Sequence, residues 1–499
     1  MKALQELVEL IDHHSSATIV KTYFRQAPTS KQAQLFVGIR EGRFRNDREA
    51  CHAIYGSEQE SGGYYKLKHD LRERLLNTII QICPKEPGSG RSMLRGYKYL
   101  TTARILLSQG RRQAAVRLLQ TVLLFCRQNE QTLLEIEALR LLRYHYGIIL
   151  GNQIRQEQIS TEISYLERRL SAENQADHWW ERIQSHFVGS QINDPRILDE
   201  AKKYALLIQE SLKELTSKKL VHRSYFLQLI HQMGYGHYTK ALGTCQQAIQ
   251  HFNSDEAIDL AKRRSYYFQA LECHLRLRDQ EGFLRCFEHL SPLVPSNSSS
   301  WFRLQLLFCQ NNLVLGQMQE AFWVWENVQA AGGTQDLFPD LRESWLLTEA
   351  YLAWLLSIGV VEAEKNCRLR TFRPGKFLNE VPVLSKDKKG YNVPILIAQI
   401  LHLLARRDAD QALNRIKALY KYSKRHLQEE RFGRLHTLIQ MLLRIPRARF
   451  RRRYVEPKTQ LIYQKLLEDP TLQRQRPLTV EIIPYEYLWP ILLENGLKY

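Results

Sequence analysis

The stretch LLSQGRRQAAVRLLQ, residues 106–120, sets the pattern on which the fold of this chain rests. Apolar residues lead into Gly110, and apolar residues at helical spacing resume after it with Ala114 and Ala115. Glycine accepts the left-handed backbone that ends a helix, and a small residue early in the next helix lets the two helices approach closely. The stretch therefore predicts a helix, a short turn and a second helix.

The same pattern returns along the chain. Its clearest copies are MGYGHYTKALGTCQQAI at 233–249, LVLGQMQEAFWVWENV at 313–328 and LLARRDADQALNRI at 403–416. In a further copy, Asp279 stands at the turn and Phe283 takes the alanine position. The anchor positions Ala115, Ala241, Phe283 and Ala321 are separated by 126, 42 and 38 residues. A helix pair that recurs near every 40 residues is typical of an α-solenoid, so we predict an all-α chain of about eight helix pairs.

These stretches resemble tetratricopeptide repeats. The units are longer than the 34 residues of that repeat, and most lack the proline that follows its second helix. The resemblance implies an array whose concave face binds a partner. The end of the chain, from FLNEVPVLSKDKKGYNVPILIAQIL at 377–401 through EIIPYEYLWPILLE at 481–494, also resembles a family of uncharacterised bacterial proteins typical of Bacteroidota. This resemblance extends over much of the chain and implies no particular activity.

Two segments interrupt the helical pattern. CPKEPGSGRS at 83–92 is rich in Pro and Gly and predicts a linker, and 371–394 is too long for an ordinary repeat connection. We therefore expect a small N-terminal helical domain at 1–83, a linker at 84–92, a tetratricopeptide-like array at 93–370, a long basic loop at 371–394, basic helical repeats at 395–470 and a tail at 471–499.

The positive charge of the chain is unevenly distributed. The formal net charge is +19, of which residues 361–470 carry +14 and residues 1–100 carry +5, whereas residues 101–360 hold 27 basic and 27 acidic side chains. Clustered positive charge attracts polyanions by Coulomb forces and counterion release. A generally basic, soluble surface is the alternative interpretation.

The first candidate site is PRARFRRRYVEPK at 446–458, where arginines surround Phe450 and precede Tyr454. Arginine forks bind phosphates or carboxylates, and the aromatic rings can stack on bases. A solvated helix face and an acidic peptide partner are the alternatives. With the basic loop, the predicted binding residues here are Arg447, Arg449, Arg451, Arg452, Arg453, Lys386, Lys388 and Lys389.

The second candidate lies near the N-terminus. Asn46 or Asp47 can cap a helix that ends at Gly56, and a second helix follows with an apolar stripe that includes Leu67, Leu71 and Leu75. The arrangement predicts either a helix-turn-helix that reads DNA or an ordinary packing domain. Lys66, Lys68 and Arg72 lie off the stripe and are the predicted nucleic-acid contacts. A glycine-rich loop at 88–92 is interpreted as a linker rather than a phosphate site.

No pattern of catalysis or metal binding is present. The chain lacks HExxH, GxSxG, CxxC and the phosphate-binding GxxxxGK[ST], so we expect no enzyme activity, no metal site and no cofactor. The apolar stretch Trp345–Val361 predicts a buried helix, and we expect neither a membrane span nor a membrane partner. The eight cysteines predict core residues in a reducing cytoplasm.

Two functions follow from these observations. The leading hypothesis is a non-enzymatic scaffold or adaptor that binds a protein partner on its concave face, with a basic C-terminal surface for acidic or phosphate-bearing ligands. The alternative is a nucleic-acid-binding regulatory subunit that contacts DNA or RNA through the C-terminal patch, the N-terminal helix-turn-helix or both. Under both hypotheses the chain can be a subunit of a larger complex.

Overall fold

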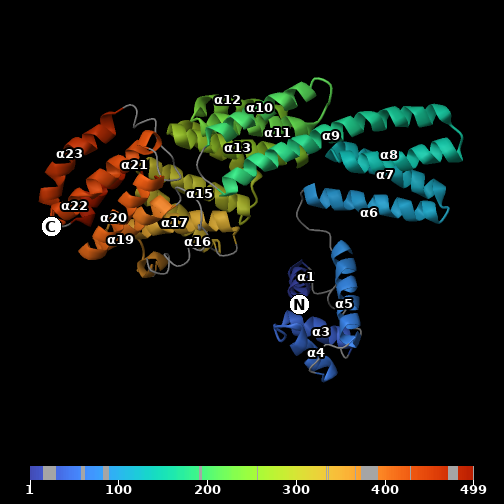
Figure 1. Ribbon diagram of the computed structural model, residues 1–499, viewed down its shortest axis with the longest axis horizontal. Coiled ribbons are helices and arrows are strands. Elements are labelled where there is room, and N and C mark those ends of the chain that lie inside the picture. The colour runs from blue at the N-terminus through green and yellow to red at the C-terminus, as the bar shows by residue number, and fades with distance from the viewer. Residues whose placement is uncertain are drawn as a thin grey trace. The chain divides into compact units, whose positions relative to one another are not determined.

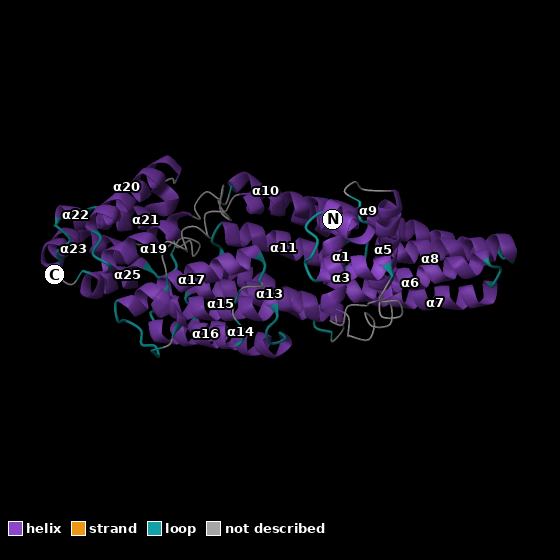
Figure 2. Ribbon diagram, turned by 90° about the horizontal axis from the view of Figure 1, so that it is seen from below, coloured by secondary structure: helices purple, strands orange, loops and turns teal. Residues whose placement is uncertain are grey.

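A computed structural model describes most of the chain. It covers residues 1–14, 30–57, 62–81, 89–189, 194–254, 257–332, 334, 337–365, 367–372, 392–426, 429–469 and 481–497. Every regular element in these ranges is a helix, as Figure 2 shows, so the predicted all-α class is confirmed. The contacts divide the chain into two units, Met1–Glu167 and Arg168–Tyr499.

The first unit begins with a small group of helices. They are α1 (Lys2–His14), α3 (Lys31–Arg40), α4 (Asp47–Tyr55) and α5 (Gly62–Gln81). The Asn46 side chain accepts a hydrogen bond from the Glu49 N–H, and Gly56 ends α4 with a φ of 71°, as the sequence predicted. Val8, Leu71 and Leu75 are buried in the core that these helices share.

Three further helices follow in antiparallel order within the first unit (Figure 1). They are α6 (Ser89–Ser108), α7 (Arg112–Asn129) and α8 (Thr132–Tyr144), and a π-helical turn, η1 (His145–Ile149), leads into α9 (Gln153–Gly189). Helix α6 begins inside the segment predicted as a linker. Helix α9 runs through residues 172–175 without a break, so 130–172 and 175–215 do not form separate helix pairs. No Gly or Pro interrupts residues 153–188, and the Arg169–Glu173 ion pair spans one turn of the helix at 2.8 Å.

The second unit consists of helices that contact their neighbours in sequence order. They are α10 (Pro195–Ser211), α11 (Lys218–Gly234), α12 (Tyr238–His251), α13 (Ala257–Leu277), α14 (Gln280–Leu290), η2 (Ser291–Leu293), α15 (Ser299–Val314), α16 (Met318–Ala330), α17 (Pro339–Ser357), η3 (Arg368–Thr371), α19 (Asn392–Ala405), α20 (Ala409–His426), α21 (Glu429–Leu442), α22 (Arg444–Arg447), α23 (Arg452–Glu468), α25 (Tyr485–Ile491) and η4 (Leu492–Gly496). Asp194 caps α10 with Pro195 in its first turn, and Ser298 caps α15.

One turn geometry recurs between helices. At the turn after α11, the Gly236 N–H donates to the Met233 carbonyl at 2.9 Å and the His237 N–H donates to the Gln232 carbonyl at 2.8 Å. The same two bonds also end helices at Gly42, Gly359 and Arg449. Between the two helices of a pair they close four other turns, and in all five of these turns the central residue has a positive φ. These central residues are Gly110, Gly236, Arg278, Gly316 and Arg407. Two are arginines rather than the Asp residues that the sequence suggested, because Asp279 and Asp408 instead accept N–H bonds at the start of the next helix.

Five residues after each central turn residue stands a side chain with 0% exposure. These anchors are Ala115, Ala241, Phe283, Ala321 and Ala412. A methyl group in that place allows the second helix to lie against the first. In the unit with Phe283, the preceding Gly282 provides the close approach, since a Cβ there would lie 2.3 Å from the His274 ring.

The segment predicted as a C-terminal tail is core in its described part. Tyr485, Leu488, Trp489 and Leu492 are each 1% exposed and belong to the same hydrophobic cluster as Trp354 of α17. The predicted buried helix around Trp345–Val361 is confirmed by α17. Among the described residues no helix is long and apolar enough to cross a membrane.

Most of the cysteines lie in the core, as the sequence predicted. Six of them are buried as free thiols among the helices: Cys51, Cys126, Cys245, Cys273, Cys286 and Cys309. Cys367 is half-buried, and Cys83 lies outside the described residues. They therefore serve as small apolar residues of the core.

The adjacent alanines of α7 provide a test of the anchor position. Ala115→Leu is expected to lower the free energy of unfolding by about 1–3 kcal/mol, because the added atoms have no space between the helices. Ala114→Leu, at the exposed neighbouring position, is expected to change it by less than about 0.5 kcal/mol. Urea denaturation followed by circular dichroism measures both, and equal effects would contradict the role of the anchor.

Two buried histidines predict acid sensitivity. Burial lowers the pKa of His402 to about 4 and that of His222 to about 3. The folded state therefore favours the neutral rings, and their stability contribution is present above the unfolded pKa near 6.5 and is lost as the pH falls towards the folded values. As the pH falls from 6.5 to 5, each histidine is expected to lower the free energy of unfolding by about 2 kcal/mol. His402→Gln keeps a donor for the Ala350 carbonyl and is expected to flatten the dependence of unfolding free energy on pH. An unchanged slope would show that His402 does not titrate in this way.

Candidate binding site in the C-terminal helices

The arginine-rich stretch forms a tight turn between α22 and α23. Arg449 and Phe450 have positive φ values of 52° and 58°, and the Phe450 N–H donates to the Ile445 carbonyl at 3.0 Å. This backbone turns Phe450 towards the hydrophobic core, where it is half-buried. The turn therefore presents arginines to solvent and takes its central aromatic ring inward.

Most of the charge in this turn is unbalanced. Arg452 lies 3.3 Å from the Glu456 carboxylate, and the Arg453 guanidinium lies 4.6 Å from the centre of the Tyr454 ring. Among the described residues, no carboxylate lies within 4 Å of the guanidinium nitrogens of the other predicted arginines of the turn. These are Arg447, Arg449 and Arg451, all of them exposed. The base stacking that the sequence suggested for Phe450 is not supported, because that ring packs inward.

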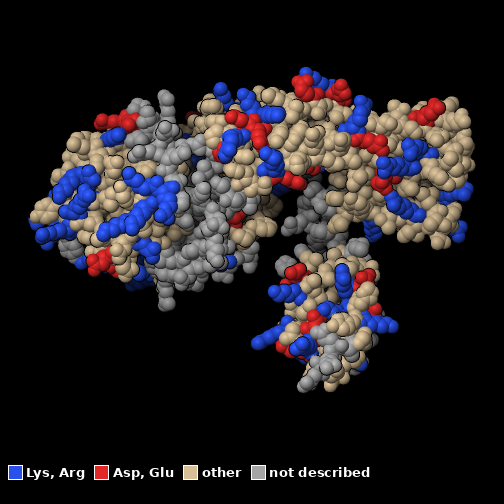
Figure 3. All heavy atoms as spheres, in the orientation of Figure 1, with Lys and Arg blue, Asp and Glu red and all other residues tan. Residues whose placement is uncertain are grey.

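Helix α20 adds a second row of positive charge. Lys417, Lys421 and Lys424 follow at helical spacing on its exposed side, while Ile416 and Leu419 are buried on the opposite side. Figure 3 shows Lys and Arg clusters over the surface of α20 to α23. The sequence singled out none of these lysines, although the net charge of residues 361–470 contained the signal.

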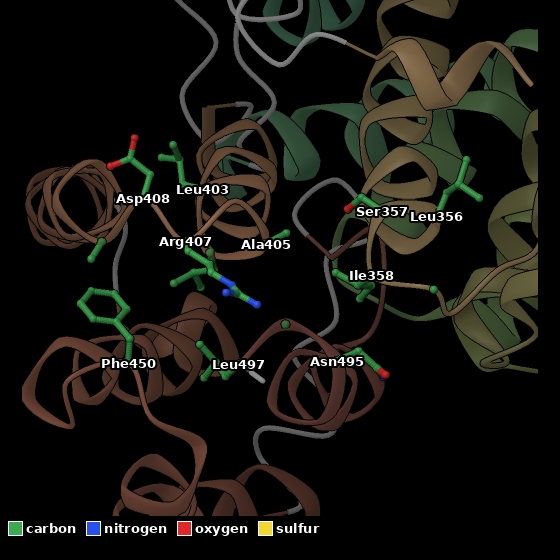
Figure 4. Close-up of a pocket in the computed structure, with 14 residues that line it drawn as sticks. Leu356, Ser357, Ile358, Leu403, Ala405, Arg407, Asp408, Phe450, Asn495 and Leu497 are labelled. Carbon is green, nitrogen blue, oxygen red and sulfur yellow. The ribbon is translucent and has the colours of Figure 1, made fainter. Parts of the chain in front are cut away.

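A cavity of about 480 Å³ lies beside the arginine turn. It opens where α17 and α19 end, and the turn at 407–409 and residues 495–497 complete its wall (Figure 4). Its apolar lining comes from Leu356, Ile358, Leu403, Leu404, Phe450 and Leu497. Because Phe450 belongs to both features, the cavity and the arginine turn adjoin.

Polar groups also line this cavity. Arg407 and Asp408 come from the turn before α20, and Ser357 and Asn495 lie on other parts of the wall. The Asp408 carboxylate accepts bonds from the Gln411 N–H at 3.1 Å and from its side-chain amide at 2.6 Å, so it caps α20. Among the described lining residues Asp408 is the single carboxylate and none is a histidine, so these residues form no acid–base pair.

A buried ion-pair network fixes the wall that carries residues 495–497. The Arg434 guanidinium, 1% exposed, binds both oxygens of Glu481 at 2.7 and 3.0 Å and also binds Glu486. Arg278 of the recurring turn binds the other Glu486 oxygen at 2.5 Å. Burial disfavours the charge of Arg434, but the hydrogen bonds and attraction of Glu481 and Glu486 outweigh burial and raise the pKa of Arg434 above its usual value.

The remaining predicted contacts fall into two groups. Lys386, Lys388 and Lys389 lie outside the described residues, so the structure does not place them. Lys66 and Arg72 are exposed on α5, as the apolar stripe predicted.

Lys68 is held within the N-terminal helices. Its amine lies 2.7 Å from the Asp47 carboxylate, which also binds the Met1 amine at 3.0 Å and the Tyr64 hydroxyl at 2.9 Å. Partial burial opposes ionisation of Asp47, but the bonds from Lys68, the N-terminus and Tyr64 outweigh it and lower the Asp47 pKa. The structure therefore gives Lys68 an internal partner, and the use of α5 as a DNA-reading helix stays a prediction.

Comparison with known proteins gives no indication of the function. No family model, no curated protein and no solved structure matches this chain. In the part of the chain that the structure describes, no group of three His, Cys, Asp or Glu side chains is placed to hold a metal ion.

Replacing Lys68 tests its internal role. Lys68→Met is expected to leave Asp47 short of a partner and to destabilise residues 31–81 by about 1 kcal/mol, since the pair is partly exposed. Hydrogen exchange of peptides from that region measures the effect. Lys66→Met removes the same charge from the exposed side of α5 and serves as the control. Equal protection in both variants would mean that the Lys68–Asp47 pair contributes nothing to stability.

Proposed function

We propose that this protein is a non-enzymatic scaffold or adaptor of stacked, tetratricopeptide-like helix pairs that binds protein partners. In this proposal the concave face of the array carries one partner, as expected from the repeat pattern, and the C-terminal surface binds an acidic or phosphate-bearing segment. The observation that carries the proposal is a partly apolar cavity beside exposed arginines, whose guanidinium nitrogens have no carboxylate within 4 Å among the described residues.

The two parts of this site suit two parts of a peptide. A cavity of about 480 Å³ is large enough for an apolar side chain or a small group of them. Arg447, Arg449 and Arg451 present charged forks that bind carboxylates or phosphates bidentately. An acidic segment with one apolar residue satisfies both at once, because burial gives affinity and the charges give orientation and a fast encounter.

Nucleic acid is the second candidate ligand. The row formed by Lys417, Lys421 and Lys424 favours it, since regularly spaced cations can follow a phosphate backbone. The apolar cavity has no role in backbone contact, however, and Phe450 packs inward. The peptide ligand therefore accounts for more of the geometry.

Binding of defined probes distinguishes the two ligands. Fluorescence anisotropy of the full chain is measured with a Glu-rich peptide that contains one Leu, with the same peptide containing Ser instead, and with single-stranded and duplex DNA. We expect the Leu peptide to bind most tightly and its affinity to fall with salt. Arg447→Ser, Arg451→Ser and Arg453→Ser together are expected to weaken it by about tenfold or more.

Two controls locate the binding energy. Lys202→Ser, Lys203→Ser and Lys240→Ser together remove the same charge from exposed positions of α10 and α12 and are expected to leave affinity unchanged. Ala405→Phe fills the cavity and is expected to weaken only the Leu peptide. Tighter binding of DNA that is insensitive to Ala405→Phe would favour the nucleic-acid candidate, and no binding of any probe at low salt would exclude both.

A further inference from the structure

The turn between α8 and α9 exposes an unusual set of apolar side chains. Tyr144, Ile148, Leu150 and Ile154 are 61, 65, 58 and 74% exposed within eleven residues. They occupy the end of α8, the π-helical turn, the connection and the start of α9, and we call them the apolar tip. Side chains of this size are costly to leave in water together, which marks the tip as an interaction surface.

The tip lies in a segment without acidic residues. Residues 138–156 contain no Asp or Glu, and neither do residues 87–129, which include α6 and α7. Residues 101–360 are neutral as a whole, but residues 89–156 alone hold eleven Lys and Arg against three Glu. Of these three, Glu135 and Glu137 are already bound by Arg127, Arg104 and Arg140.

Arginines flank the tip on two connections. The α6–α7 and α8–α9 turns lie at the same end of this group of helices in Figures 1 and 2. Arg111 and Arg112, at the α6–α7 turn, are exposed and form no ion pair with the described residues. Arg155, at the start of α9, lies 5.9 Å from the centre of the Tyr146 ring. The end of the helices that carries the apolar tip therefore also carries arginines and a tyrosine.

We propose that the apolar tip inserts into the surface of a membrane that contains anionic lipids. A protruding apolar turn needs no shaped groove to enter the boundary between headgroups and acyl chains, and arginines and tyrosines suit the headgroup level. Anionic lipids attract the acid-free end of the helices. A second copy of this chain is a poorer occupant, because two such ends repel each other.

This surface attachment is compatible with the absence of a spanning helix among the described residues. The sequence predicted no membrane partner because it contains no span, but insertion of a turn requires only a few apolar residues and nearby cations. A single weak apolar anchor gives reversible binding, and a basic surface supplies the second attraction. The two contributions can therefore be removed separately.

Sedimentation of the full chain with lipid vesicles tests the proposal. Vesicles of phosphatidylcholine with and without phosphatidylglycerol are used at low and high salt. The protein is expected to sediment with the anionic vesicles and to be released by salt. Ile148→Glu with Ile154→Glu is expected to reduce partition by about tenfold or more. Arg111→Ser with Arg112→Ser is expected to reduce binding to anionic vesicles alone.

Matched variants separate insertion from general attraction. Leu206→Glu with Leu207→Glu adds the same charge at exposed leucines of α10 and is expected to retain vesicle binding. The Arg447, Arg451 and Arg453 variant is also expected to retain it, which distinguishes this site from the C-terminal one. The proposal is overturned if the wild-type chain does not bind anionic vesicles, if the tip and α10 variants behave alike, or if only the C-terminal variant loses binding. In the first case an acidic protein partner becomes the occupant to consider.

Discussion

The close approach of two helices at a small, fully buried anchor is the constraint on which this structure depends. Each recurring turn ends one helix with a left-handed residue, and five residues later an anchor such as Ala241 or Ala321 has no exposed surface. The geometry leaves room for little more than a methyl group, except where Gly282 lets Phe283 take the place. Since helices of this length are marginal alone, packing at the anchors is what makes each pair stable.

A second constraint joins turns that are distant in sequence. Arg434 holds Glu481 and Glu486, and Glu486 also binds Arg278, which is 208 residues away. The same segment passes the turn at Gly316, where a Cβ would lie 3.3 Å from the Tyr487 ring. A buried guanidinium with its carboxylates is costly to separate, so the C-terminal segment is fixed as part of the helical core. That placement completes the wall of the cavity.

Packing decides which side chains of the charged segments are buried and which face solvent. In the C-terminal helices, the core takes up Phe450 and leaves its neighbouring arginines in solvent. In the first unit, Glu135 and Glu137 of α8 bind arginines of α6 and α7. The exposed arginines at the α6–α7 turn have no ion pair among the described residues. Two surfaces with different chemistry result: a partly apolar cavity beside arginines, and an exposed apolar tip beside arginines. The two proposals together describe an adaptor that connects an acidic segment to an anionic surface.

Local patterns in the sequence were enough to predict most of the helices, the glycine turns and the anchors. Periodicity, capping and left-handed preferences act within a few residues, so Ala115, Gly110 and Asn46 could be assigned without a structure. The sequence also located the bulk of the positive charge. Four features depend on tertiary packing: the expected tail is core, Lys68 is bound to Asp47, Phe450 turns inward, and a cavity adjoins the arginine turn. These features join residues far apart in the chain, and their energies depend on burial and distance, which no local pattern contains.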